Sequence, residues 1–333
     1  MNSPAITQDN IVVETRNLKK YFTTAKGPLH AVDDVNISII KGETLGLVGE
    51  SGCGKSTLGR VIIRLLEATG GSVFFDREDI VKFDKKDLRN FRKRAQMVFQ
   101  DPYSSLNPRL SVEQLIAEPL RIHKIYPNDR ETLTRVRELM DTVGLAQRLR
   151  TSFPHELDGG RRQRIGMARA LAMNPEFIVL DEPVSALDVC IQAQILNLLL
   201  DLKDQFQCTY LFITHDLSVV RHLSNRIAVM YLGKVIELAD HLEIFENPQH
   251  PYTQALLSAI PIPKPSISRK GRIILEGDVP SPVNPPSGCR FYGRCPSRQA
   301  DCQEKSPELT EISPNHYIAC YHPGPIAVKK MSA

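Results

Sequence analysis

No stretch of this sequence approaches the roughly 18 consecutive apolar residues that mark a membrane-spanning helix. The first residues, Met1 to Asn10, also lack the basic and then apolar pattern of a secretion signal. The sequence also lacks a large excess of one charge sign, because it has 42 basic and 38 acidic residues. A net charge of +4 does not by itself indicate a nucleic-acid binder. We therefore expect a cytosolic protein.

Cysteine is also sparse, with seven residues in a chain of 333. An odd number of cysteines in a chain of this size argues against a disulfide framework and for free thiols or metal ligation. The apolar content of 42% supports a sizeable core. The length allows one large domain with an appendage, or two domains.

The most informative motif is Gly49 to Thr57, which fits the phosphate-binding pattern G-x-x-x-x-G-K-[ST] in full. The preceding Thr44 to Val48 has the composition of a short buried strand, and Leu58 to Leu66 carries apolar residues at helical spacing. The alternative is a Gly/Ser-rich turn with a chance lysine. The strand, glycine loop and helix in this order favour a nucleoside triphosphate site instead.

Within the loop, Lys55 is expected to neutralise the β and γ phosphate oxygens, and Ser56 to ligate magnesium. The glycines let the backbone wrap the phosphates, and the helix N-terminus adds its positive dipole end. The remaining loop residues expected to bind the nucleotide are Gly49, Ser51, Gly52, Gly54 and Thr57.

Four polar residues stand at or just beyond the ends of predicted strands: Gln100, Asp181, Glu182 and His215. Each alone has an ordinary structural explanation, such as a solvated turn. Open α/β sheets, however, place their ligands at the carboxyl ends of strands. Beside a phosphate loop, Asp181 is expected to hold magnesium and Glu182 to orient the attacking water.

The remaining pattern divides the chain. A β-rich opening predicts strands at Ile11 to Val13 and Ala31 to Ile40, with the pair Tyr21-Phe22 between them. Such a pair is more often part of a core, but here an aromatic ring could reach the base of a nucleotide. Residues 103 to 173 predict an inserted helical subdomain with helices at 112–123 and 131–143 and a last helix beginning at Gly159.

The order of these motifs resembles the ATP-binding subunit of an ABC importer of the oligopeptide/dipeptide/nickel type, in particular the second, F-type ATPase subunit of a heterodimeric pair. The resemblance implies an α/β fold of the ABC-type P-loop NTPase class, with a mixed sheet, an antiparallel β subdomain and a helical subdomain in residues 1–245. It adds a small C-terminal extension at 246–333. It implies an ATPase that uses ATP and Mg²⁺ to energise peptide import.

The resemblance also assigns roles to single residues. Phe22, at the better spacing after Leu18, takes the place of the aromatic that stacks on adenine. Gln100 is the glutamine that touches magnesium and senses the membrane subunits. Asp181 is the Walker B magnesium ligand and Glu182 the catalytic base. Two further positions are the D-loop residue Asp188 and the switch histidine His215.

The signature motif departs from the family pattern Leu-Ser-Gly-Gly-Gln, because the chain reads Leu157-Asp158-Gly159-Gly160-Arg161. The glycines still permit close approach to the partner's ATP. A carboxylate at Asp158 near a γ-phosphate costs on the order of several kcal/mol unless a group such as Arg161 compensates it. We expect a heterodimer with two unequal ATP sites.

From about residue 246 the chain becomes proline-rich, with one short strand predicted at Arg272 to Leu275. Asn247 to Thr253 and Gly277 to Pro282 resemble the C-terminal region of peptide importers. Four cysteines in this segment suggest that a metal centre helps it fold. In relatives, four similarly placed cysteines hold a 4Fe-4S cluster; zinc and free thiols remain alternatives. The four are Cys289, Cys295, Cys302 and Cys320.

The other three cysteines, Cys53, Cys190 and Cys208, are expected to be ordinary small residues. The resemblance implies several partners: a second ATPase subunit, two membrane permease subunits and an extracytoplasmic binding protein, with no nucleic acid. It places the chain peripherally on the cytoplasmic face of the membrane. The cargo stays open between a dipeptide, a longer peptide, a sugar and a nickel chelate.

Two rival functions stay open on the sequence. One is a soluble ABC ATPase of DNA repair or translation, although such proteins carry a coiled-coil insertion or two tandem cassettes. The other is a redox-regulated ATPase that uses the cysteine segment as its sensor.

Overall fold

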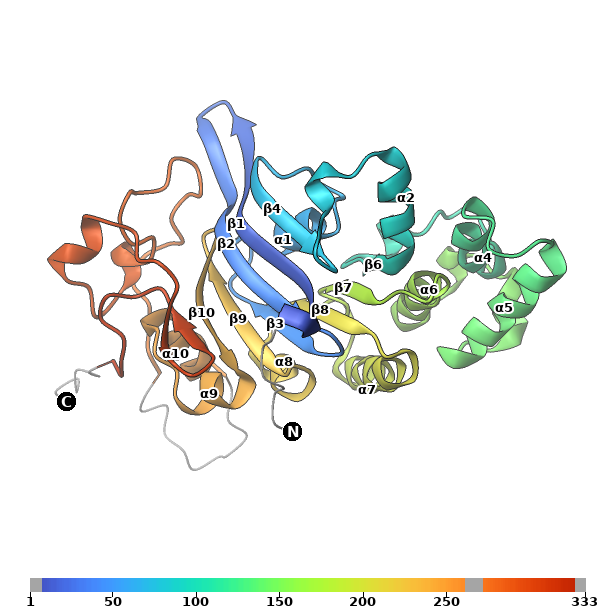
Figure 1. Cartoon of the computed structure of the whole chain (residues 1–333). Helices are drawn as coiled ribbons and strands as arrows, with labels where there is room; N and C mark the ends of the chain where they lie inside the picture. The colour runs from blue at the N-terminus through green and yellow to red at the C-terminus, as the bar shows by residue number, and fades with distance from the viewer. Residues whose placement is uncertain (1–7, 261–271, 327–333) are drawn as a thin grey trace. The chain divides into compact units, whose positions relative to one another are not determined.

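The computed structural model describes residues 8–260 and 272–326, which form two compact units (Figure 1). Within the described residues, the first unit contains 8–38, 44–81 and the chain from 214 onward. The second unit contains Ile39–Glu43 and Lys82–Ile213. The C-terminal extension therefore belongs to the same unit as the phosphate loop.

The first unit contains an antiparallel layer with the strand order β2-β1-β4-β5. β1 and β4 pair with Val13 opposite Phe75, and both side chains are buried. The opening strands are longer than the sequence predicted, so that Tyr21 and Phe22 lie within β1 rather than between strands. The strands are β1 (Ile11–Thr24), β2 (Gly27–Ile40), β4 (Gly70–Phe75) and β5 (Glu78–Asp79).

A second sheet in this unit follows the order β11-β12-β10-β9-β3. β3 and β9 are parallel, and β9 and β10 form a hairpin in which Leu232 and Gly233 both have positive φ, as a tight two-residue turn requires. The strands are β3 (Thr44–Val48), β9 (Arg226–Tyr231), β10 (Lys234–Asp240), β11 (Thr310–Ser313) and β12 (His316–Ile318).

The C-terminal extension adds structure that the sequence did not predict. β12 pairs antiparallel with β10, with Ile318 opposite Glu237, so the extension contributes strands to this sheet. The prediction of a strand at Arg272 to Leu275 is wrong, because this segment has no regular structure. The helices of the first unit are α1 (Lys55–Ile62), α8 (Leu217–Leu223), α9 (His241–Glu246) and α10 (Pro251–Ser258).

Helix α1 is shorter than its apolar pattern suggested. The pattern continues to Leu66, but α1 ends at Ile62 and Arg64 adopts a φ of 51°. A side chain in this left-handed region cannot continue a right-handed helix. Leu65 is consequently 44% exposed rather than buried against the sheet.

The second unit is built on three parallel strands in the order β8-β7-β6, with Leu180 of β7 opposite Val98 and Phe212. β7 and β8 are buried at every position, as expected for parallel strands covered on both faces. The elements are β6 (Ala95–Val98), β7 (Phe177–Asp181), β8 (Thr209–Thr214), α2 (Lys85–Arg94), α3 (Pro102–Ser105) and α7 (Val189–Phe206).

The helices predicted between residues 103 and 173 are present as α4 (Val112–Ile122), α5 (Asp129–Thr142) and α6 (Gly159–Leu171), which pack against one another (Figure 1). Side chains cap each of them: Ser111 begins α4 in a capping box with Gln114, and Asn128 begins α5. Among the described residues, no helix is long and apolar enough to cross a membrane.

Candidate nucleotide and metal-binding sites

The phosphate loop follows β3 and ends at the N-terminus of α1. Two of its glycines are required by close contacts: a Cβ at Gly49 would lie 2.2 Å from the carbonyl oxygen of Met230, and one at Gly54 would lie 1.9 Å from that of Ala31. Gly52 has a positive φ of 79° but open space around it. The loop is thus pressed against the neighbouring backbone at both ends and open in its middle, where Ser51 is exposed.

Lys55, the first residue of α1, is 5% exposed. Its Nζ donates hydrogen bonds to the carbonyl oxygens of Gly49 at 2.8 Å and Glu50 at 3.0 Å. The ammonium group is therefore held inside the loop by the loop's own backbone. Ser56 and Thr57 follow on α1 and are half-buried.

The two aromatic residues near the end of β1 differ in how they are held. The Tyr21 hydroxyl donates to Asp33, and its ring stacks on His30 with centroids 4.0 Å apart. Phe22 is 36% exposed, with Lys20 Nζ 5.0 Å from its ring centroid. Phe22 is thus partly exposed, whereas Tyr21 is held by its neighbours.

In the second unit, the residues predicted at strand ends gather at the end of β7. Asp181 is fully buried and Glu182 is 9% exposed. Gln100 Nε2 donates to Glu182 Oε2 at 3.0 Å, which joins the ends of two neighbouring strands. Glu182 has a φ of 45°, a strained conformation for a residue with a side chain and one that is frequent at functional sites.

The start of α6 carries the unusual signature motif. The Asp158 carboxylate caps the helix by accepting the backbone N–H of Arg161 at 2.8 Å, a role that serine also fills well. Arg161 Nε lies 3.4 Å from the other oxygen of Asp158, and both side chains are about half exposed. The substitution therefore preserves the helix start, and Arg161 partly balances the added charge.

The glycines of the signature lie against the segment before and within α7. A Cβ at Gly160 would lie 2.7 Å from Ile191, and one at Gly159 would lie 3.0 Å from Leu187. Asp188 caps α7 by accepting the backbone N–H of Ile191. The signature and the predicted D-loop are therefore in contact within this chain.

His215 follows β8 in an exposed position of the first unit, and the next residue, Asp216, caps α8. The residues predicted for the nucleotide are thus divided between units. The phosphate loop, Phe22 and His215 belong to the first, and Gln100, Asp181, Glu182 and the signature belong to the second.

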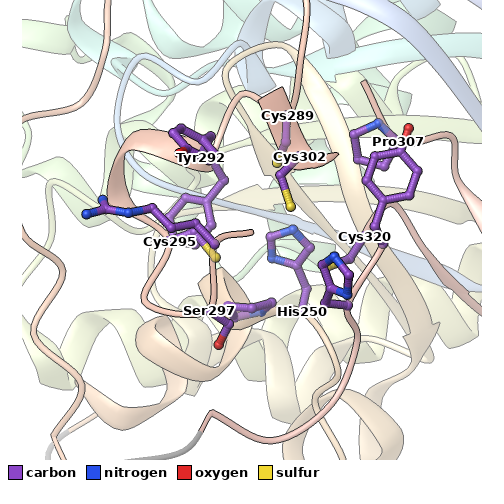
Figure 2. Close-up of a pocket in the computed structure, with 13 residues that line it drawn as sticks. His250, Cys289, Tyr292, Cys295, Ser297, Cys302, Pro307 and Cys320 are labelled. Atoms are coloured by element: carbon purple, nitrogen blue, oxygen red, sulfur yellow. The ribbon is translucent and has the colours of Figure 1, made fainter. Parts of the chain in front are cut away.

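The four cysteines of the extension line one pocket in the first unit, together with the buried His250 (Figure 2). All four are free thiols. Burial raises the pKa of Cys295 to about 11 and that of Cys320 to about 12, and it lowers the pKa of His250 to about 4. Such thiols stay protonated at neutral pH unless a cation replaces the proton.

Two further side chains beside these cysteines were missed on the sequence: His322, which lines the pocket, and Asp301, which lies next to Cys302. Asp301, Cys302 and His322 have ligand atoms within 4.8 Å of one another, a grouping matched nowhere else in the described residues. His322 Nε2 lies 2.8 Å from Asp301 Oδ2. Both residues stand within two positions of a cysteine of the set, which is the signal that could have found them.

Comparisons with known proteins identify the family of the chain. Residues 32–185 match the family described as "ABC transporter", and residues 236–302 match "Oligopeptide/dipeptide transporter, C-terminal region". The chain is similar to the oligopeptide transport ATP-binding protein AppF of Bacillus subtilis (strain 168), with 51% identity over 319 residues, 93% of this chain and 97% of the relative. It is 50% identical over 310 residues to OppF of the same organism, covering 93% and 96%.

Solved structures give the same result for the fold. The ATP-binding cassette MJ0796, in a post-hydrolysis state bound to ADP and Pi, superposes with a TM-score of 0.63 and 31% identity, covering 69% of this chain and 98% of that one.

Proposed function

This chain belongs to the oligopeptide-transport branch of the ABC transporter ATP-binding proteins, and on that premise we propose that it energises oligopeptide import by hydrolysing ATP. The fold is the ABC-type P-loop NTPase fold with a C-terminal oligopeptide-transporter region. The observation that carries the proposal is the phosphate loop with its enclosed Lys55, combined with the strained Glu182 held by Gln100.

The chemistry follows from the donors that each segment offers. Carboxylate, hydroxyl and amide oxygens are the ligands that Mg²⁺ prefers, which fits Asp181, Ser56 and Gln100. Bound magnesium neutralises developing charge on the phosphates. Glu182 orients the attacking water as general base, and His215 contacts the γ-phosphate. The exposed ring of Phe22 stacks on adenine.

The signature suggests that the chain works in a heterodimer with two unequal sites. In this proposal the ATP bound by this chain is the hydrolytic one, because Glu182 and His215 are intact. The partner's ATP faces Asp158, whose charge is partly balanced by the half-exposed Arg161 at 3.4 Å. The variant Asp158→Ser tests this directly: turnover at the partner's site should rise, and unchanged turnover would contradict the asymmetry.

We also propose a metal centre on Cys289, Cys295, Cys302 and Cys320, and favour a 4Fe-4S cluster. Four thiols around one pocket are a suitable donor set for such a cluster or for zinc. A tetrahedral zinc site brings its sulfurs within about 4 Å of one another. Among the described residues the four sulfurs do not form a group within a 4.8 Å limit, so they do not meet this spacing as they stand.

The free space among these side chains is only about 10 Å³, so they must separate to admit a cluster. Iron and acid-labile sulfide analysis of anaerobically purified protein decides between the alternatives. Four irons and four sulfides per chain are expected, whereas one zinc per chain, or no metal, would refute the cluster.

The partners in this proposal are a second ATPase subunit, two permease subunits and an extracytoplasmic binding protein, with this chain at the cytoplasmic face of the membrane. The support is the family of its relatives, which are oligopeptide transport ATP-binding proteins. The test is ATPase activity of the complex reconstituted in vesicles with its binding protein. Oligopeptides should stimulate hydrolysis; stimulation by a sugar or a nickel chelate, and not by peptides, would overturn the cargo assignment.

A further inference from the structure

Arg294, in the cysteine-bearing segment, forms a two-fold ion pair with Glu50 of the phosphate loop. Its Nη1 lies 2.7 Å from one carboxylate oxygen of Glu50, and its Nη2 lies 3.1 Å from the other. The side chain of Arg294 is 9% exposed and that of Glu50 is 26% exposed. A bidentate pair with this burial is strong and geometrically specific, unlike an exposed surface pair.

Glu50 occupies a position from which its charge matters to a nucleotide. It is the second residue of the phosphate loop, and its carbonyl oxygen accepts a hydrogen bond from Lys55. Its backbone N–H donates to the hydroxyl of Tyr252, on α10, at 2.9 Å. A carboxylate at the loop that receives a triphosphate repels it, unless a cation neutralises that carboxylate.

The same segment contacts β2, the neighbour of the strand that carries the adenine-stacking candidate. Arg290 donates to Asp33 and to the carbonyl oxygen of Leu232, and Asp33 accepts from the hydroxyl of Tyr21, next to Phe22. Both arginines immediately flank cysteines of the pocket, because Arg290 follows Cys289 and Arg294 precedes Cys295.

Aromatic packing makes this connection stiff. Phe291 is 1% exposed and packs edge-on against Tyr231 and Tyr252, with centroids 5.2 and 5.4 Å away. Tyr252 is the residue that accepts the N–H of Glu50. The cysteine segment therefore reaches the phosphate loop by an ion pair and by a packed aromatic cluster, both within one compact unit.

We propose that Arg294 is a positioning residue for this chain's own ATP site: it neutralises and fixes Glu50, so that the fold of the cysteine segment sets the affinity of the phosphate loop for ATP. The inference rests on the proposed function for ATP binding at this loop and for the metal centre that would order this segment. Arg294 itself touches neither the nucleotide nor the cysteines' sulfur atoms in this account.

Loss of the pair has a defined electrostatic consequence. The variant Arg294→Gln leaves the charge of Glu50 uncompensated, so the affinity for ATP should fall about tenfold, within the range usual for coupled sites. ADP carries less negative charge than ATP, so the affinity of the variant for ADP should fall by a smaller factor. Added salt should reduce the difference between variant and parent, since screening weakens the repulsion.

The experiment is a fluorescence titration of the full chain with a labelled ATP analogue and then with the ADP analogue, at low and high salt. Arg298→Gln is the matched control, because Arg298 lies four residues away and contacts the carbonyl of Gly293 and the ring of Tyr292 rather than Glu50. Arg298 also lines the cysteine pocket, so this variant counts as a control only when its metal content equals that of the parent. The double variant Arg294→Gln/Glu50→Gln removes both charges and should recover most of the affinity.

Circular dichroism and metal content of each sample separate this outcome from misfolding. If Arg294→Gln does not fold, Arg294→Lys, which keeps the charge but loses the two-fold geometry, takes its place with a smaller loss expected. Equal affinities for parent and folded variant, an equal loss in Arg298→Gln, or no recovery in the double variant would overturn the inference. Absence of metal from all samples would overturn the proposed centre alone.

Discussion

The buried carboxylate of Glu237 offers the sharpest test of how the extension is attached to the nucleotide-binding unit. Glu237 lies on β10, is fully buried, and accepts three hydrogen bonds. The donors are the backbone N–H of Gln249 at 2.7 Å, the backbone N–H of His250 at 3.1 Å, and Nε2 of His316 at 2.8 Å. One carboxylate thus holds the start of α10 and strand β12.

The variant Glu237→Ala leaves these three buried donors without their acceptor. Each unsatisfied buried group costs about 1–3 kcal/mol, and relaxation recovers part of the sum. For the three groups together we expect a loss of about 3–5 kcal/mol. Since about 1.4 kcal/mol corresponds to a factor of ten, hydrogen-exchange protection of α10 and β12 should fall by at least about a hundredfold.

Hydrogen exchange followed by mass spectrometry measures this effect segment by segment. The control is Glu243→Ala, whose carboxylate lies 3.9 Å from the other ring nitrogen of His316 but is 52% exposed. An exposed pair contributes little, so this variant should change protection by a small factor only. Equal loss in the two variants, or undiminished protection of α10 and β12 in Glu237→Ala, would refute the reasoning.

Three further predictions concern the first and second units. Gly54→Ala should abolish ATP binding in an equilibrium titration, because the new Cβ would lie 1.9 Å from a carbonyl oxygen. At Gly52 the new Cβ would meet open space, so Gly52→Ala should cost only about 1 kcal/mol of backbone strain. Iodoacetamide at neutral pH should alkylate exposed Cys190 and spare Cys208, whose pKa burial raises to about 11; faster labelling of Cys208 by mass spectrometry would contradict this. Burial alone would raise the pKa of Asp33, but its hydrogen bonds and a neighbouring guanidinium group lower the pKa overall. The charged Asp33 therefore stabilises the fold at pH values above its ordinary pKa near 4, and this stabilisation is lost as the pH falls through the lowered pKa. The midpoint temperature of thermal unfolding should accordingly be lower for Asp33→Asn than for the parent at neutral pH, and the two midpoints should converge in acid.

Local patterns were sufficient where short segments determine the structure. The phosphate loop could be recognised from the sequence because its fold requires glycine at fixed positions. At Gly49 and Gly54 a neighbouring carbonyl group leaves no room for a Cβ. Helices α4 and α5 were predictable because their apolar faces are periodic and their ends carry the capping residues Ser111 and Asn128. Gln100 and Glu182 could be expected to meet because both follow parallel strands, and they do form a hydrogen bond.

Long-range contacts were beyond this kind of reasoning. Arg294 and Glu50 are 244 positions apart, and no local pattern marks either as a partner of the other. β12 has only three residues, and its pairing with β10 is accompanied by a buried contact between His316 and Glu237 that no local pattern reveals. Conversely, the short apolar run at Arg272 to Leu275 has strand-like composition but is not a strand in the described structure, where the N–H of Ile273 donates to the hydroxyl of Ser258.

The central claim is that this chain hydrolyses ATP through Glu182 to drive oligopeptide import. Uptake of a labelled oligopeptide into vesicles that contain the assembled importer and ATP tests it most directly, with the parent chain compared against Glu182→Gln. We predict ATP-dependent uptake with the parent chain. In the variant, both uptake and hydrolysis should fall by at least about a hundredfold while ATP binding is retained. Substantial uptake and turnover with Glu182→Gln would contradict the account.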